Sequence, residues 1–212
     1  LHLDADALAR LRVTVGGATR QDSVQAGLRV LPADIGLVLV HDAARPLIDR
    51  ATIERCLEAT HRFGAAIAAV PVAATLKQVD PDGRILRTVD RSGLWQAQTP
   101  QGAQRDLFAR ASAEADRTGL VCTDEAALLE AAGIPVQVVE GSERNLKITR
   151  PGDLQVAAAL LGEALPMRIG HGFVHLLFLA LDWQRLAHQL NADRVAVAGE
   201  TLARRLGLFA LV

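Results

Sequence analysis

The feature that most constrains the fold is an alternation between short apolar runs and segments with helical spacing. The runs at Ile35–Val40 and Ala65–Val72 are apolar almost throughout, as in strands that are covered on both faces. Between them, the segment from about Ala51 to Phe63 is predicted to form a helix, which Asp49 caps and Gly64 ends. This alternation predicts a three-layer α/β domain with a mostly parallel sheet.

A turn signal predicts a protruding arm. Asp80-Pro81-Asp82-Gly83 separates two alternating segments, Thr75–Val79 and Arg84–Val89, which is typical of a hairpin. Ligands of α/β sheets bind beyond the carboxyl ends of the strands, so we expect the chemistry there. Further strands are expected at Arg12–Val15, at Leu94–Gln98 (ended by Thr99-Pro100) and at Val136–Glu140, and further helices at Asp22–Leu31, Arg105–Ala115, Asp124–Ala132 and Thr149–Leu161.

Composition limits the partners of the chain. Its 212 residues are 50% hydrophobic and 22% charged, which suits one or at most two domains. A net charge of −1 argues against a nucleic-acid or anionic-membrane surface, so any phosphate site must be local. No signal peptide or membrane span is expected. Cys56 and Cys122 are expected to pack as small apolar residues in a reducing cytosol rather than to form a disulfide framework.

The first candidate site is the sequence HDAARP, which follows directly on a buried strand. It places the carboxylate of Asp42 and the guanidinium of Arg45 at the strand's carboxyl end. A carboxylate there can hold Mg²⁺ or a sugar hydroxyl, and an arginine can bind a phosphate through two parallel hydrogen bonds. The alternative interpretation is a salt bridge within the loop.

Three further motifs carry candidate residues, each with an ordinary structural alternative. Arg91 lies at the base of the predicted arm and could equally be a solvated surface residue, while Trp95 could belong to the core. Thr123 is a suitable N-cap for the helix that follows, although a hydroxyl at a helix start can also face an anion. Lys147 lies between apolar residues before a helix start, where it could bind a phosphate or simply face solvent.

Taken together and in this order, the motifs resemble the 2-C-methyl-D-erythritol 4-phosphate cytidylyltransferase family. The resemblance runs from about Val13 to Leu161. It is carried by GGATRQDSV at Gly16–Val24, VHDAARP at Val40–Pro46, TVDRSGLWQAQTPQ at Thr88–Gln101, TDEAALLE at Thr123–Glu130 and NLKITRPGDL at Asn145–Leu154.

The resemblance implies a reaction and roles for particular residues. The family transfers the cytidylyl group of CTP to the phosphate of 2-C-methyl-D-erythritol 4-phosphate with Mg²⁺, and releases pyrophosphate; positioning and charge stabilisation supply most of the catalysis. Arg91 and Lys147 match the pair that positions the polyol phosphate. Gly17 and Ser23 match the loop on the nucleotide side, and the residues that match further contacts to substrate, nucleotide and metal are Asp42, Arg45, Thr75, Thr99 and Thr123, with Asp42 as the metal candidate.

The resemblance also implies a cytoplasmic homodimer. Family members interlock through their arms, and some substrate contacts cross the interface. Here the arm is the hairpin over residues 75–89.

The chain departs from the family pattern near both ends. The family opens with a strand and a Gly-rich loop whose arginine and lysine cradle the triphosphate of CTP, and nothing similar stands in Leu1–Arg12. We therefore expect a strand–loop–helix unit of roughly 30 residues to be missing, and the chain as given to be inactive or nearly so.

The second departure concerns the tail, and it fixes the expected domain organisation. Residues Met167–His175 resemble the start of a 2-C-methyl-D-erythritol 2,4-cyclodiphosphate synthase, but without the zinc-binding aspartate of that enzyme. His175 alone is a poor zinc site, and both His171 and His175 are interpreted as ordinary histidines. A disrupted bifunctional fusion would explain both ends. We expect a partial cytidylyltransferase domain at residues 1–161, a linker at 162–166 and a tail at 167–212.

Two alternative functions remain open at this point. One is nucleotidyl transfer to another polyol phosphate, against which Arg91 and Lys147 in their motifs argue. The other is a non-catalytic remnant that folds and dimerises through its arm.

Overall fold

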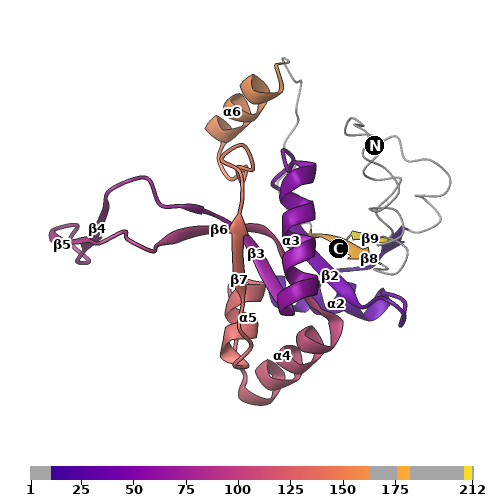
Figure 1. Ribbon diagram of the computed structural model, residues 1–212. Helices are drawn as coiled ribbons and strands as arrows, with labels where there is room; N and C mark the ends of the chain where they lie inside the picture. Colours follow the sequence, from indigo (N-terminus) through magenta and orange to yellow (C-terminus); the bar gives the residue numbers. More distant parts are fainter. Residues whose placement is uncertain (1–10, 163–175, 182–207, 212) are drawn as a thin grey trace.

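The structure is a computed structural model that describes residues 11–162, 176–181 and 208–211. Seven strands form one sheet in the order β1-β9-β8-β2-β6-β3-β7, and β4 pairs with β5 alone. This hairpin extends well away from the body, so the predicted arm is confirmed (Figure 1). The bounds are β1 Arg12–Val13, β2 Leu37–Asp42, β3 Ala65–Pro71, β4 Leu76–Val79, β5 Ile85–Val89, β6 Trp95–Gln104, β7 Gln137–Glu140, β8 Leu176–Leu181 and β9 Leu208–Leu211.

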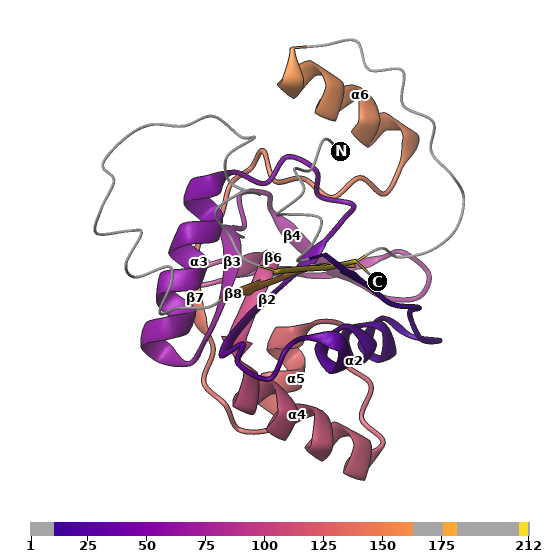
Figure 2. The ribbon, with the colours of Figure 1, turned by 90° about the vertical axis from the view of Figure 1, so that its right-hand side faces the viewer.

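Helices cover both faces of the sheet, which confirms the three-layer prediction. Their bounds are α2 Arg20–Val30, α3 Arg50–Phe63, α4 Arg105–Thr118, α5 Glu125–Ala131 and α6 Pro151–Leu161. Figure 2 shows α2, α4 and α5 together on one side of the sheet. The predicted ends of α3 are also confirmed, because the Asp49 side chain accepts a hydrogen bond from the backbone of Thr52 and Gly64 adopts a φ of 89° after the last turn.

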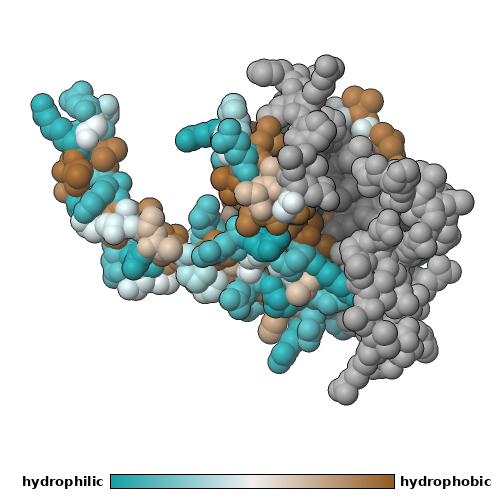
Figure 3. Space-filling view, turned by 90° about the horizontal axis from the view of Figure 1, so that it is seen from above, coloured by the Kyte–Doolittle hydropathy of each residue, from teal (hydrophilic) through white to brown (hydrophobic). Residues whose placement is uncertain are grey.

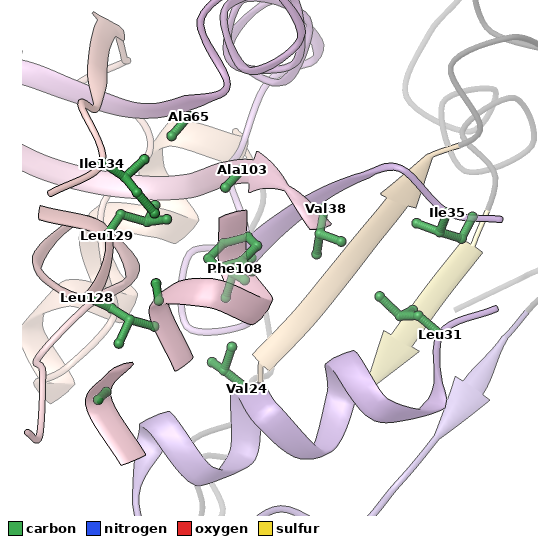
Figure 4. Close-up of a cluster of buried hydrophobic side chains, with 13 residues drawn as sticks. Val24, Leu31, Ile35, Val38, Ala65, Ala103, Phe108, Leu128, Leu129 and Ile134 are labelled. Carbon is green, nitrogen blue, oxygen red and sulfur yellow. The ribbon is translucent and has the colours of Figure 1, made fainter. Parts of the chain in front are cut away.

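Two apolar clusters hold the layers together. Alternate side chains of β2 point to opposite faces of the sheet. Val38 and Val40 pack towards α2, α4 and α5, whereas Leu37 and Leu39 pack against α3. Phe108 of α4 is fully buried in the first cluster (Figure 4). Such two-sided burial explains why the sequence of β2 reads as one continuous apolar run.

The prediction of a mostly parallel sheet is wrong. β2, β3 and β7 do run in the same direction, but β6 lies between β2 and β3 and is antiparallel to both. β8 is also antiparallel to β2. The sequence of β6, WQAQTPQGAQ, is not an apolar run, and its pattern did not reveal which strands it lies between or in which direction it runs.

The strand predicted at Leu94–Gln98 continues through Thr99-Pro100 to Gln104. The pairing of β6 with β3 is irregular here, because the register shifts between Ile67 and Ala69. A proline, which has no N–H to donate, is tolerated at such an irregularity. Residues 101–104 then pair with β2.

Two segments of the tail join the large sheet. β8 pairs with all six residues of β2, and β9 links β8 to β1. Neither strand was predicted from the sequence. Residues Met167–His175 lie outside the described residues, and the division into domains at 162–166 stays a prediction. Within the described ranges, no helix combines the length and the apolar character needed to cross a membrane.

Candidate active site

The candidate site is built where β2 ends. The buried run of β2 finishes with His41 and Asp42, both of which are buried polar residues. The backbone N–H of Asp42 donates to the Thr99 hydroxyl at 3.0 Å, and this hydroxyl is 2.9 Å from Nδ1 of His41. The predicted residues Asp42 and Thr99 are therefore brought together by the pairing of β2 with β6.

His41 supports the loop rather than the chemistry. Its Nε2 lies 3.1 Å from the carbonyl oxygen of Arg45. The two contacts suit a neutral ring that donates from Nε2 and accepts the Thr99 hydroxyl proton at Nδ1. Burial lowers the pKa of His41, against the raising effects of the Arg45 carbonyl and the Asp42 charge. The ring is therefore neutral near pH 7. Its contact with the Arg45 carbonyl oxygen holds the turn that carries Arg45 in place.

Asp42 is surrounded by three cations. Its Oδ2 lies 2.8 Å from Nζ of Lys147 and 3.8 Å from Nε of Arg45, while its Oδ1 lies 3.5 Å from Nη2 of Arg20. Burial tends to raise the pKa of Asp42, but the hydrogen bond and charge of Lys147 and the charges of Arg20 and Arg45 outweigh it and lower the pKa. The carboxylate is therefore ionised near pH 7.

The loop that carries Lys147 is tied to the ends of β2 and β6. Arg45 donates from Nη1 to the Asn145 carbonyl at 2.8 Å, and the Ile148 N–H donates to the Ala44 carbonyl at 2.8 Å. The fully buried Asn145 side chain donates to the Thr99 carbonyl at 2.7 Å. These bonds hold the backbone on both sides of Lys147, so the lysine that the sequence predicted is held beside Asp42.

The nucleotide-side loop predicted from Gly17 and Ser23 forms the start of α2. The Gly17 N–H donates to the Ser23 hydroxyl at 3.1 Å, and Thr19 and Asp22 form a capping box. A Cβ on Gly17 would stand 2.1 Å from Cβ of Asp22, so only glycine fits this close approach. The next residue after the cap, Arg20, reaches Asp42, which connects the loop to the charged centre.

Arg20 and Glu125 also belong to the centre, although neither was predicted from the sequence. Arg20 donates from both terminal nitrogens to the two carboxylate oxygens of Glu125, at 2.5 and 2.7 Å. Burial alone would lower the pKa of Arg20, but the hydrogen bonds and charge of Glu125 raise it. Both residues lie within the motifs quoted above, but the motifs do not indicate which distant residue each of them contacts.

Three predicted residues lie apart from this centre. Thr75 and Arg91 are exposed at the arm, and Thr123 is exposed before α5. Within the described part of the chain, their side chains make no hydrogen bond or ion pair. The expectation that Thr123 caps the helix is wrong, because the Asp124 carboxylate accepts the N–H of Ala127 and takes that position.

The charge of the centre favours an anion over a resident metal ion. Arg20, Arg45 and Lys147 face the two carboxylates Asp42 and Glu125, so the cluster is net positive. No group of three or more metal-ligating side chains occurs among the described residues. Mg²⁺ often binds through only one or two carboxylates plus substrate phosphates, but cations already neighbour both oxygens of Asp42. The residues present do not form a Mg²⁺ site by themselves.

The chain was compared with protein families and with individual proteins. Residues 2–163 match the family model described as IspD, 2-C-methyl-D-erythritol 4-phosphate cytidylyltransferase. A bifunctional enzyme IspD/IspF from Desulfotalea psychrophila is 47% identical over 207 residues, which cover 95% of this chain and 50% of that protein. A 2-C-methyl-D-erythritol 4-phosphate cytidylyltransferase from Nostoc is 48% identical over 160 residues, which cover 73% of this chain and 70% of that protein.

The fold agrees with that of solved structures. The crystal structure of 2-C-methyl-D-erythritol 4-phosphate cytidylyltransferase from Thermus thermophilus matches with a TM-score of 0.65 and 44% identity. The match covers 69% of this chain and 71% of that one. The chain thus spans about half the length of the bifunctional relative and about 70% of the length of the other two.

Proposed function

Because the chain belongs to the 2-C-methyl-D-erythritol 4-phosphate cytidylyltransferase family, we propose that it acts in cytidylyl transfer from CTP to 2-C-methyl-D-erythritol 4-phosphate. An oxygen of the substrate phosphate attacks the α-phosphorus of CTP. The bond from that phosphorus to the oxygen that bridges to the β-phosphate breaks, and pyrophosphate leaves. The product is 4-diphosphocytidyl-2-C-methyl-D-erythritol, a precursor in the non-mevalonate isoprenoid pathway.

The observation that carries this proposal is the net positive centre around Asp42, at the carboxyl end of β2. In this centre Lys147 is the most exposed cation, with 40% of its side chain accessible against 12% for Arg45. Lys147 binds the phosphate of the polyol substrate. Asp42 and Arg45 contact the substrate from the buried side. The attacking oxygen is thereby held in position, which is the main contribution such a site can make.

The loop around Gly17 and Ser23 binds the cytidine. Its conformation is fixed by the Gly17–Ser23 hydrogen bond and the capping box, so little order has to be gained on binding. Thr99 supports Asp42, and Thr123 faces the nucleotide from the start of α5. Mg²⁺ would enter with the CTP phosphates and would neutralise their charge.

The arm makes the protein a homodimer. Val79, Ile85 and Leu86 are 51%, 63% and 60% exposed on the hairpin, and a group of hydrophobic residues lies near its far end (Figure 3). Such a surface is typical of an interface. Arg91 and Thr75 are proposed to complete the centre of a second copy. This would account for their exposed position at the arm, outside the centre of their own chain. A cytoplasmic location stays a prediction.

A pyrophosphate-release assay with CTP, Mg²⁺ and a panel of polyol phosphates tests this function. We expect slow release that requires both CTP and 2-C-methyl-D-erythritol 4-phosphate, and that falls about 100-fold in Lys147→Ala and in Arg91→Ala. The assay is run at high protein concentration, so that slow turnover is detected. Equal turnover with ribitol 5-phosphate would instead favour a nucleotidyltransferase for another polyol. A folded dimer without turnover would favour the non-catalytic remnant.

A further inference from the structure

The three cations around Asp42 are held to different degrees. Arg45 is 12% exposed and also donates to the Asn145 carbonyl. Arg20 is 19% exposed and is bound through two hydrogen bonds to Glu125. Lys147 is 40% exposed, and among the described residues Asp42 is its single hydrogen-bonding or ion-pair partner. Two of the cations are therefore fixed by other groups, and one is not.

Glu125 is what fixes Arg20. Its side chain is only 3% exposed and lies in the first turn of α5. Gln101 of β6 accepts the N–H of Ala126 and donates to Asp124, so the start of this helix is anchored to the sheet. The position of the Glu125 carboxylate is therefore fixed. Its bidentate contact with Arg20 in turn fixes the plane of the Arg20 guanidinium.

A buried carboxylate cannot easily lose its only counter-charges. The Asp42 side chain is only 6% exposed in the structure, so its carboxylate needs compensation from other cations when Lys147 leaves it to bind a phosphate. Arg20 cannot follow the phosphate without abandoning Glu125, so it remains beside Asp42. The second fixed cation, Arg45, remains because it also donates to the Asn145 carbonyl oxygen.

We propose that Glu125 and Arg20 are positioning residues, which keep Asp42 compensated so that Lys147 can exchange between Asp42 and the substrate phosphate. This inference rests on the proposed function for the identity of the phosphate ligand, but the exchange itself is a property of the charged centre. Without the Arg20–Glu125 pair, Asp42 retains Lys147 more tightly. Phosphate binding is then weaker, although neither Arg20 nor Glu125 touches the ligand.

The test replaces both charges at once in the full chain. Arg20→Gln/Glu125→Gln removes the pair without leaving one buried charge alone, a change that folded proteins commonly tolerate. The matched control is Glu114→Gln/Arg117→Gln, which removes the exposed ion pair of α4. Circular dichroism and thermal unfolding identify any variant that fails to fold.

Competitive acetylation measures the availability of Lys147 without any ligand. The sequence contains only two lysines, Lys77 and Lys147, and the exposed Lys77 on the arm is the internal reference. We expect Lys147 in the double variant to react about threefold more slowly relative to Lys77, which is a typical effect of a partly exposed ion pair. In the control variant, we expect the ratio of the Lys147 acetylation rate to the Lys77 acetylation rate to equal that of the wild type. An unchanged or faster Lys147 in the folded double variant would overturn the proposal.

Calorimetric binding of 2-C-methyl-D-erythritol 4-phosphate supplies the second measurement. We expect the double variant to raise Kd about threefold, and to raise it no further when Lys147→Ala is already present, because the effect passes through Lys147. An additional loss in the Lys147→Ala background would mean that Arg20 contacts the ligand itself, and would contradict the proposal. If acetylation slows as expected while the wild type does not bind this phosphate, the exchange stands and the proposed function fails.

Discussion

Cys56 shows at the residue scale how burial decides chemistry. Its side chain is fully buried, and Sγ lies 3.5 and 3.4 Å from the carbonyl oxygens of Ala66 and Pro100. Burial raises the pKa of this thiol to about 12, and nearby hydrogen bonds only partly oppose the change. Cys122 is half-buried, and both cysteines are free thiols, as the sequence predicted.

We therefore predict that the folded chain reacts with a thiol reagent at Cys122 alone. Two thiols react in denaturant, and Cys122→Ser leaves a folded protein with no reactive thiol. Because the pKa of Cys56 is above its ordinary value of 9.0 when folded, its contribution to the free energy of unfolding is complete below pH 9. That contribution is lost as the pH rises from 9 towards 12. A titration that detects two reactive thiols in the native protein would contradict the prediction that Cys122 alone reacts.

At the same scale, the structure brings together some of the candidate residues that the motifs supplied but leaves Thr75, Arg91 and Thr123 exposed outside the centre. Asp42, Arg45, Thr99 and Lys147 do meet: Asp42 ends β2, Arg45 and Lys147 lie in loops beside that end, and Thr99 lies within β6 next to it. Glu125 could not be found in this way, because its partner Arg20 is 105 positions away. An acid in the first turn of a helix has a sufficient local explanation in the helix dipole, so nothing pointed to the distant arginine.

At the scale of elements, Gly102 sets the distance between β6 and α3. A Cβ at this position would lie 2.3 Å from Cδ2 of Leu39 and 2.5 Å from the Thr60 hydroxyl. The Thr60 hydroxyl already donates to the Cys56 carbonyl at 2.7 Å, and Thr60 is fully buried. Neither neighbour can move without disturbing the layer between sheet and helix.

We predict that Gly102→Ala lowers the free energy of unfolding by about 2 kcal/mol, as overpacking in a core does. Gly36→Ala is the control, because a Cβ at Gly36 meets nothing within 4 Å, and it is expected to change stability by less than about 0.5 kcal/mol. Urea unfolding of the two variants measures both. Equal effects at the two positions would show that the packing at Gly102 is not tight.

The position of β8 in the sheet leads to a second prediction at the scale of elements. Because it lies between β2 and β9, every backbone N–H in its centre faces a neighbouring strand, and Leu179 is in register with Leu39. Leu179→Pro is expected to cost about 3 kcal/mol of unfolding free energy, whereas Leu179→Ile, which keeps the N–H, is nearly neutral. Unchanged stability in the proline variant would mean that β8 does not pair with β2.

The sequence predicted the helices and most strands at roughly their observed bounds, because apolar periodicity reports burial. It did not predict the direction of β6 or the pairing of β8. Both depend on which strand lies beside which, and a run such as that of β2 contains no information on its neighbours.

At the scale of the whole molecule, the exposed arm predicts the oligomeric state. Ile85→Lys/Leu86→Lys places two charges on the apolar surface of the hairpin and is expected to convert the dimer to a monomer, because charges in an apolar interface must lose their hydration. Val156→Lys is the control, since Val156 on α6 is also 53% exposed. Sedimentation velocity distinguishes the species. A wild-type monomer, or a dimer that survives the double substitution, would contradict the dimer through the arm.

The central claim is that the centre around Asp42 binds the polyol phosphate through Lys147. The most direct test is calorimetric titration of 2-C-methyl-D-erythritol 4-phosphate into the wild type, Lys147→Ala and the lysine control Lys77→Ala. The account predicts binding by the wild type and by Lys77→Ala, with affinity lowered about 30-fold in Lys147→Ala, as expected when one charge-assisted hydrogen bond is lost. Equal affinity in all three proteins would contradict it.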